Sequence, residues 1–153
     1  MPILALVAAI LLLPPIAAAR DFQIGDIAIH RPWARATAGQ APNGAAYMTL
    51  INGGDRADFL IGAAGAAAKR IELHEHTMQD GVMQMRQVKE IRVAPGAPML
   101  LEPGSLHLML ISLKAPLKEG GSFPVTLTFR EAGEIRIAVT VEGAGAMTHG
   151  QGN

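Results

Sequence analysis

The chain has 153 residues, and its 13 basic and 13 acidic side chains give a formal net charge of zero at pH 7. It has no basic block that could follow a phosphate backbone, which argues against nucleic-acid binding. It also contains no Cys, which excludes disulfide exchange, a thiolate zinc site and lipid attachment to a cysteine of this chain. Any metal must therefore be bound by His, Met, Asp or Glu.

Residues 1–19 have the pattern of a secretory signal peptide. An uncharged apolar run at 3–13 is followed by two prolines and by three alanines at 17–19, which predicts cleavage before Arg20. The run is shorter than the roughly 20 apolar residues that a membrane span needs. We therefore expect export and no stable membrane insertion after signal cleavage, with an uncleaved anchor as the alternative because no Lys or Arg precedes the run.

The remaining chain has the alternation and turn residues of many short β-strands. Asp80-Gly81 is the strongest hairpin signal, and no amphipathic helix of ordinary length is found, although residues 63–70 allow one short turn. Such closely spaced strands predict a single antiparallel sandwich or small barrel over residues 20–142. Residues 143–153 form a Gly-rich tail without a core face, which is expected to be flexible. The predicted strands are 27–33, 45–51, 58–63, 69–76, 82–88, 91–94, 98–102, 107–113, 123–129 and 134–142.

Two histidines and two methionines stand out by type and spacing. His74 is followed after ten residues by Met85, and after a further twenty-one by His107-x-Met109. Thioether sulfur and neutral imidazole nitrogen favour Cu(I) over hard cations such as Mg²⁺ or Ca²⁺. Residues two apart on a strand share a face, so His107 and Met109 can bind one ion. His74 is out of phase with the apolar residues of its own strand, which suits a ligand better than a core residue.

Each of these residues also has a structural interpretation. A Met in an apolar strand is usually a packing residue, which is our interpretation of Met48 and Met99, and His76 is readily explained as a solvated side chain. Met109 is expected to supply packing as well, so that Met109→Ala would destabilise the metal-free fold more than His107→Ala. The metal prediction therefore depends on the joint pattern of the four residues. Clustering of their side chains in the fold would contradict the interpretation that their presence is incidental.

The segments around these residues match a known family. They are residues 31–37, 44–50, 72–76, 80–83, 103–110 and 113–117, and with the ligand spacing they extend over roughly 24–141. In these segments the chain resembles the periplasmic copper chaperone family PCuAC. The resemblance implies an all-β, cupredoxin-like Greek-key β-sandwich with a metal site at one exposed end. It implies that His74, Met85, His107 and Met109 are the Cu(I) ligands.

The resemblance also implies a role. The protein would accept Cu(I) in the periplasm and deliver it for cytochrome c oxidase assembly, with copper-accepting assembly proteins or an oxidase subunit as partners. Enzymatic activity is not expected, because blue-copper electron transfer normally uses a Cys thiolate and this chain has none. General copper binding or sequestration and a non-metal interaction domain are the alternatives. The tail offers only Met147 and His149, which leaves a second copper site open but disfavoured.

Overall fold

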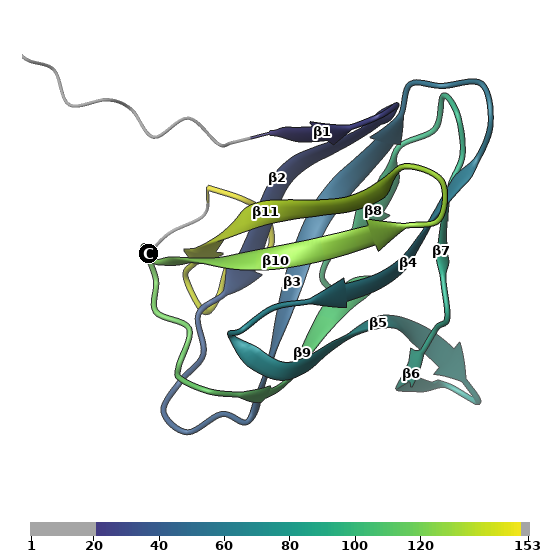
Figure 1. The fold of residues 1–153 in the computed structure, drawn as a ribbon. Coiled ribbons are helices and arrows are strands. Elements are labelled where there is room, and N and C mark those ends of the chain that lie inside the picture. The colour runs from purple at the N-terminus through teal and green to yellow at the C-terminus, as the bar shows by residue number, and fades with distance from the viewer. Residues whose placement is uncertain (1–20, 151–153) are drawn as a thin grey trace, which may run out of the picture.

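The structure is a computed structural model that describes residues 21–150. The signal peptide predicted at 1–19 lies outside the described residues. Within residues 21–150 the chain forms eleven strands and no helix (Figure 1). The strands are β1 (Phe22–Ile24), β2 (Ile27–Arg35), β3 (Asn43–Asn52), β4 (Asp58–Ala64), β5 (Ala68–Gln79), β6 (Val82–Gln87), β7 (Ile91–Val93), β8 (Met99–Leu101), β9 (His107–Leu113), β10 (Ser122–Phe129) and β11 (Gly133–Glu142).

All ten predicted strands are present, and β1 is an additional one. The largest difference in length is in β5, which continues beyond the predicted end at residue 76 to Gln79. The short helical turn considered at 63–70 is wrong, because β4 extends to Ala64 and β5 begins at Ala68, with only a tight turn between them. No helix in the described residues is long and apolar enough to cross a membrane.

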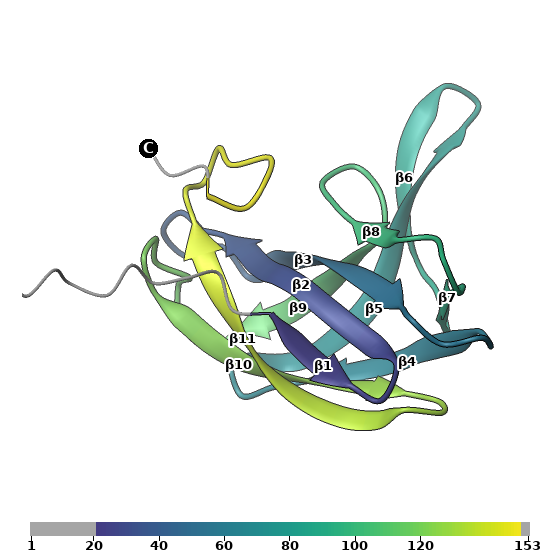
Figure 2. The same ribbon diagram turned by 90° about the horizontal axis from the view of Figure 1, so that it is seen from above.

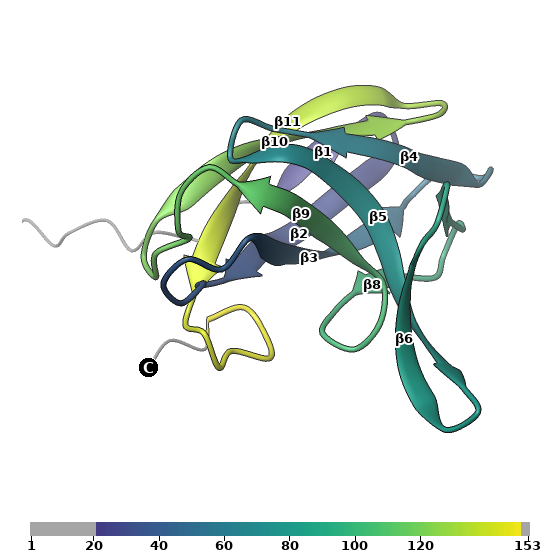
Figure 3. The ribbon, with the colours of Figure 1, turned by 90° about the horizontal axis from the view of Figure 1, so that it is seen from below.

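The strands form one sheet that closes on itself. Their order is β1-β2-β11-β10-β4-β5-β9-β3-β8, and an additional pairing of β2 with β3 closes the ring. The pairs are antiparallel except for β11 with β2, which is parallel. Seen from above and below, the closed sheet has two facing layers (Figures 2 and 3). The predicted all-β sandwich with a single domain is therefore confirmed, in the form of a flattened barrel.

Side chains on one face of each strand build the core, and those on the other face point away from it. In β10, Phe123, Val125, Leu127 and Phe129 are buried while the threonines between them are only partly covered. Full burial of such a side chain contributes about 1.5 to 3 kcal/mol relative to exposure. In β5 and β9, Leu73, Leu108 and Leu110 are buried in the core, so the neighbours of each along the strand point to the other face.

The hairpin of β5 and β6 projects from the barrel (Figures 2 and 3). Its turn is Asp80-Gly81, as predicted, and both residues have positive φ angles, 51° and 78°. This is the backbone that a two-residue hairpin turn of the primed type requires. All six residues of β6 are exposed. The hairpin therefore depends on its own strand pairing more than on the core.

The tail packs against β2 and β3. Ala146 is buried in a small cluster with Trp33 and Tyr47, and Arg35 Nε donates a hydrogen bond to the Ala146 carbonyl at 2.7 Å. The expectation that the tail lacks a core face is wrong for Ala146. The short apolar side chain packs in the cluster that the two aromatic rings form, which a count of Gly residues does not reveal. The flexibility of residues 143–153 as a whole stays a prediction.

Candidate metal centre

The register of β5 and β9 brings three of the four predicted residues together. His74 is the direct cross-strand partner of His107, and Met109 follows two residues later on β9. Directly opposed residues share a face, as do residues two apart on one strand. The centroids of the two imidazole rings are 5.9 Å apart. The three residues lie on the outer face, because Leu73 and Leu108 point into the core.

Met85 flanks this group from the projecting hairpin. Its partner on β5 is His76, one same-face position further out than His74, and its side chain is 44% exposed. Met109 pairs with Glu72 at the other end of the group. Those two partners, Glu72 and His76, are four positions apart on β5, which corresponds to roughly 13 Å along the strand. Met85 thus shares the face of the other three but is the outermost of the set.

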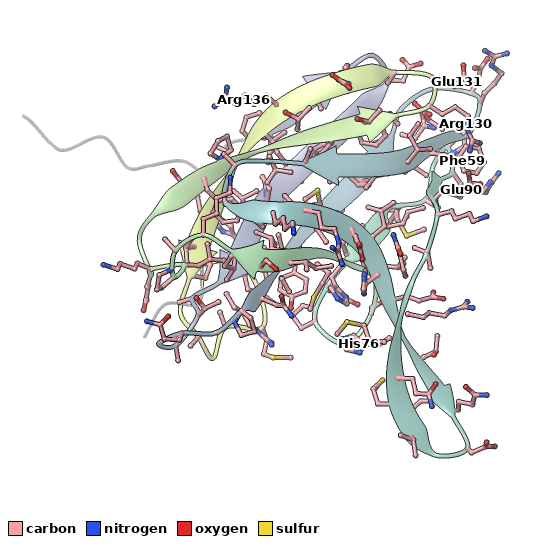
Figure 4. All side chains as sticks on the ribbon, turned by 60° about the horizontal axis from the view of Figure 1, so that its bottom comes forward. Phe59, His76, Glu90, Arg130, Glu131 and Arg136 are labelled. Carbon is pink, nitrogen blue, oxygen red and sulfur yellow. The ribbon has the colours of Figure 1, made fainter. Side chains whose placement is uncertain are left out.

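His76 also belongs to this cluster, which corrects its interpretation from the sequence as a solvated side chain. Its ring stacks on His107 with centroids 5.1 Å apart and an angle of 29° between the planes. Its Nδ1 is buried and has no hydrogen-bond partner. The His74-x-His76 spacing places both rings on one strand face, which is the sequence signal that identifies it. Figure 4 shows His76 near the root of the hairpin.

The hydrogen bond of His107 leaves one ring nitrogen free to bind a metal. Its Nδ1 lies 3.0 Å from the Ser105 carbonyl oxygen. A carbonyl oxygen can only accept, so Nδ1 donates its proton and Nε2 keeps a lone pair. The ring is only 2% exposed. Burial lowers the pKa of His107; the Ser105 hydrogen bond opposes this, and His76 and His74 add to the lowering. His107 is therefore neutral at pH 7.

A carboxylate orients His74 in a complementary way. His74 Nε2 donates to Glu72 Oε2 at 2.8 Å, which leaves Nδ1 as the acceptor nitrogen of the neutral ring. That Nδ1 is buried and has no partner. The hydrogen bonds from His74 and then from Arg70 lower the pKa of Glu72, against the effect of burial. Glu72 therefore remains a carboxylate that holds the His74 ring in place, and metal-binding histidines commonly donate their other ring N–H to such a carboxylate.

Aromatic side chains of β2 and β3 flank the cluster beside His107. The Tyr47 ring lies 6.3 Å from the His107 ring, and Trp33 packs on Tyr47 at 4.7 Å. Burial raises the pKa of Tyr47, with Arg35 opposing it, so the phenol stays protonated. These rings, with Ala146 against them, limit the access of water to His107 from this side.

The available donors fit a soft ion. No group of three or more His, Asp or Glu side chains within residues 21–150 is arranged to hold a metal. The lone pairs that the structure leaves free are Nδ1 of His74 and His76 and Nε2 of His107, and thioethers share their face. Imidazole and thioether are borderline and soft donors, a set that selects Cu(I) among common biological metals.

The fold and the donor cluster together define a class of domain: a flattened β-barrel that carries His and Met side chains clustered on its outer face. A family model described as "Putative lipoprotein LpqE-like" matches residues 27–141. The "Putative lipoprotein Lxx21020" of Leifsonia xyli subsp. xyli (strain CTCB07) is 33% identical over 131 residues, which are 85% of this chain and 78% of that protein. The chain therefore belongs to the LpqE-like family.

Solved structures of copper-binding domains have the same fold. The copper-bound PCuAC domain from PmoF2 superimposes with a TM-score of 0.70 at 27% identity, over 81% of this chain and 98% of that domain. CuI-DR1885 from Deinococcus radiodurans gives a TM-score of 0.59 at 29% identity, over 86% and 85% of the two chains. The predicted likeness to PCuAC domains is thus confirmed.

Proposed function

We propose that this protein is an exported Cu(I) chaperone whose ligands are His74, Met85, His107 and Met109. The observation that carries the proposal is the pairing of His74 with His107. Each ring has one nitrogen engaged by a hydrogen bond and the other left for a metal. The copper in the PmoF2 domain and the Cu(I) in DR1885 support the same choice of cargo.

The donor set suits an ion that is to be carried and released. Two neutral imidazoles and two thioethers can surround Cu(I) without losing a proton at pH 7. Thioethers cannot form disulfides, so the site would tolerate an oxidising compartment, with Met oxidation as its weakness. A Cys-based acceptor would bind Cu(I) more tightly and withdraw it. Met85, on the projecting hairpin, is the ligand whose departure disturbs the barrel least.

The proposed acceptors are oxidase-assembly proteins or a cytochrome c oxidase subunit in the periplasm. The domain would act as a carrier, without catalysing a reaction. Sequestration of copper uses the same four ligands but no acceptor. Incubating the copper-loaded protein with an apo oxidase-assembly protein and measuring copper on each partner separates these two roles. If the ion stays on this protein with every such acceptor, sequestration is the better description.

The binding itself is tested by anaerobic Cu(I) titration against a chromophoric chelator. We expect one tight equivalent in the mature protein and its loss in the His107→Ala/Met109→Ala variant. A matched control, His30→Ala/Met99→Leu, replaces one His and one Met elsewhere and should retain the tight equivalent. Retention of the tight equivalent by both double variants would contradict the proposed Cu(I) site. Absence of binding in the parent would favour the alternative of a non-metal interaction domain.

A further inference from the structure

The β5–β6 hairpin carries a row of soft donors that extends beyond the four proposed ligands. Met78 and Met83 are direct cross-strand partners next to the turn, and His76 and Met85 form the next pair on the same face. Cβ atoms of directly opposed residues are about 4.5 to 5.5 Å apart. The two methionine sulfurs beside the turn are therefore able to converge on one ion.

The exposure of these methionines is not explained by packing. Met78 is 66% exposed and Met83 is 55% exposed. The opposite face of the hairpin is polar: Glu75 accepts a hydrogen bond from Arg86 at 2.5 Å, and Thr77 pairs with Gln84. Large apolar side chains gathered on one exposed face commonly mark an interaction site. Here the large apolar side chains on this face are those of Met78, Met83 and Met85, and all three are thioethers.

His76 connects the exposed pair to the inner residues. Its Nδ1 is buried and lacks any hydrogen-bond partner, although a buried polar atom normally has one. Its ring lies against His107 at 5.1 Å, and its neighbour across the hairpin is Met85. An unpartnered imidazole nitrogen on the face that carries the methionines is a free ligand for a soft ion.

We propose that Met78, Met83 and His76 form a second, outer Cu(I) site, through which the ion enters and leaves the inner site. This inference rests on the proposed function and adds the route of transfer. Successive pairs on one strand face are roughly 6.5 to 7 Å apart, so an ion can pass along the hairpin by exchanging one donor at a time. Copper remains Cu(I) throughout, and no proton is moved.

The outer site binds more weakly than the inner one and is open to an acceptor. It has fewer donors, two of them exposed, and its ordering costs the side-chain freedom of both methionines. An acceptor thiolate can approach it directly, whereas His107 is buried beneath Tyr47 and the hairpin root. The hairpin's tip is therefore where the first ligand exchange with a Cys-bearing acceptor would take place.

Site occupancy is tested by NMR of ¹³C-methyl methionine during titration with Ag(I), a redox-inert substitute for Cu(I). The first equivalent should shift the methyl signals of Met85 and Met109, and the second those of Met78 and Met83, with at least about tenfold weaker affinity. In the His107→Ala/Met109→Ala variant the Met78 and Met83 signals should shift with the first equivalent. Unmoved Met78 and Met83 signals in both proteins would overturn the outer site.

The route is tested by the rate of Cu(I) transfer from the loaded protein to a Cys-containing acceptor peptide. Met78→Leu/Met83→Leu keeps the apolar volume and removes both sulfurs. This double variant should keep the Cu(I) affinity of the inner site within about twofold of the parent and slow Cu(I) transfer by about tenfold or more. Val82→Ala, at the same tip on the other face, should change neither. An unchanged transfer rate in the double variant would overturn the route while leaving the inner site intact. If the parent protein binds no tight equivalent of Cu(I), both the inner site and the route are overturned.

Discussion

At the scale of single residues, His107 combines a structural role with the proposed ligand role. The expectation that only Met109 supplies packing is wrong, because His107 is 2% exposed whereas Met109 is only partly buried. The imidazole fills space beside Tyr47 and His76 and donates to the Ser105 carbonyl. A polar ring is favourable in this position because its one engaged N–H satisfies a backbone oxygen.

His107→Ala should therefore destabilise the metal-free protein more than Met109→Ala does. Removing a buried ring leaves a cavity and an unpaired carbonyl, at a cost of about 2 to 4 kcal/mol. Met109→Ala should cost about 1 kcal/mol, since that side chain is only partly buried. Urea denaturation of the two apo variants measures both values. Equal losses would show that the His107 pocket collapses without penalty.

Glu72→Ala should weaken Cu(I) binding although Glu72 is not a proposed ligand. Without the carboxylate, the His74 ring loses the bond that orients it, and loss of a group that orients a metal-binding histidine typically costs about 10- to 100-fold in metal affinity. Glu75→Ala is the matched control, because Glu75 lies on the opposite face and interacts with Arg86. Competition titrations of both variants are decisive, and a similar affinity for the two would argue against the orienting role.

At the scale of elements, the β5–β6 hairpin is held together independently of the core. Its strands pair over six residue pairs, but every residue of β6 is exposed. Local stability in such a segment falls below that of the whole domain. The part of the molecule that carries Met85 is therefore the part that can open without unfolding the barrel.

Gly81→Val should open the hairpin selectively. Gly81 has a φ of 78°, which a β-branched residue adopts only at a cost of about 1 to 3 kcal/mol. Amide hydrogen exchange in β6 should accelerate and Cu(I) affinity should fall, while the melting temperature of the barrel changes little. Gly96→Val, at a φ of 73° in a different turn, is the control for strain alone. A large drop in melting temperature for Gly81→Val would contradict an independent hairpin.

At the scale of the whole molecule, closure of the sheet and the buried carboxylate of Asp58 stabilise the barrel. Asp58 accepts backbone N–H bonds from Phe59, Glu131 and Ala132, which join the start of β4 to the turn between β10 and β11. Burial opposes ionisation of Asp58, but these three bonds together with the charge of Arg130 outweigh it and lower the pKa of Asp58. Arg130 beside it packs over the Phe59 ring at 4.4 Å, well away from His76 (Figure 4).

The metal-free protein should lose stability as the pH falls below about 6.5. The pKa of His107 in the fold is below its ordinary value of 6.5, so between the two values the unfolded chain binds more protons. The stability is present above 6.5 and is lost as the pH falls through the lowered pKa. Denaturation midpoints of the parent and of His107→Gln between pH 7.5 and 5 measure this. Parallel pH profiles for the two proteins would exclude His107 as the cause.

The strands and the soft donors were predictable from the sequence, because the signals that define them are local. Alternation in residues 123–129, the Asp80-Gly81 turn and the chemistry of His and Met act over a few residues. The same holds for the outward direction of His74, which follows from its phase against Leu73. The all-β class depends on nothing more distant than this, whereas the choice of Cu(I) also depends on the joint pattern of the four residues between 74 and 109.

Which strands pair, and in what register, was decided only by the tertiary structure. The alignment of His74 with His107, the burial of His107 under Tyr47 and the addition of His76 to the cluster depend on contacts between segments far apart in the chain. So does the packing of Ala146 on the aromatic rings. Strand alternation identifies which face of each strand is buried. It does not identify which other strand lies beside it, because that choice is made by the packing of the whole core.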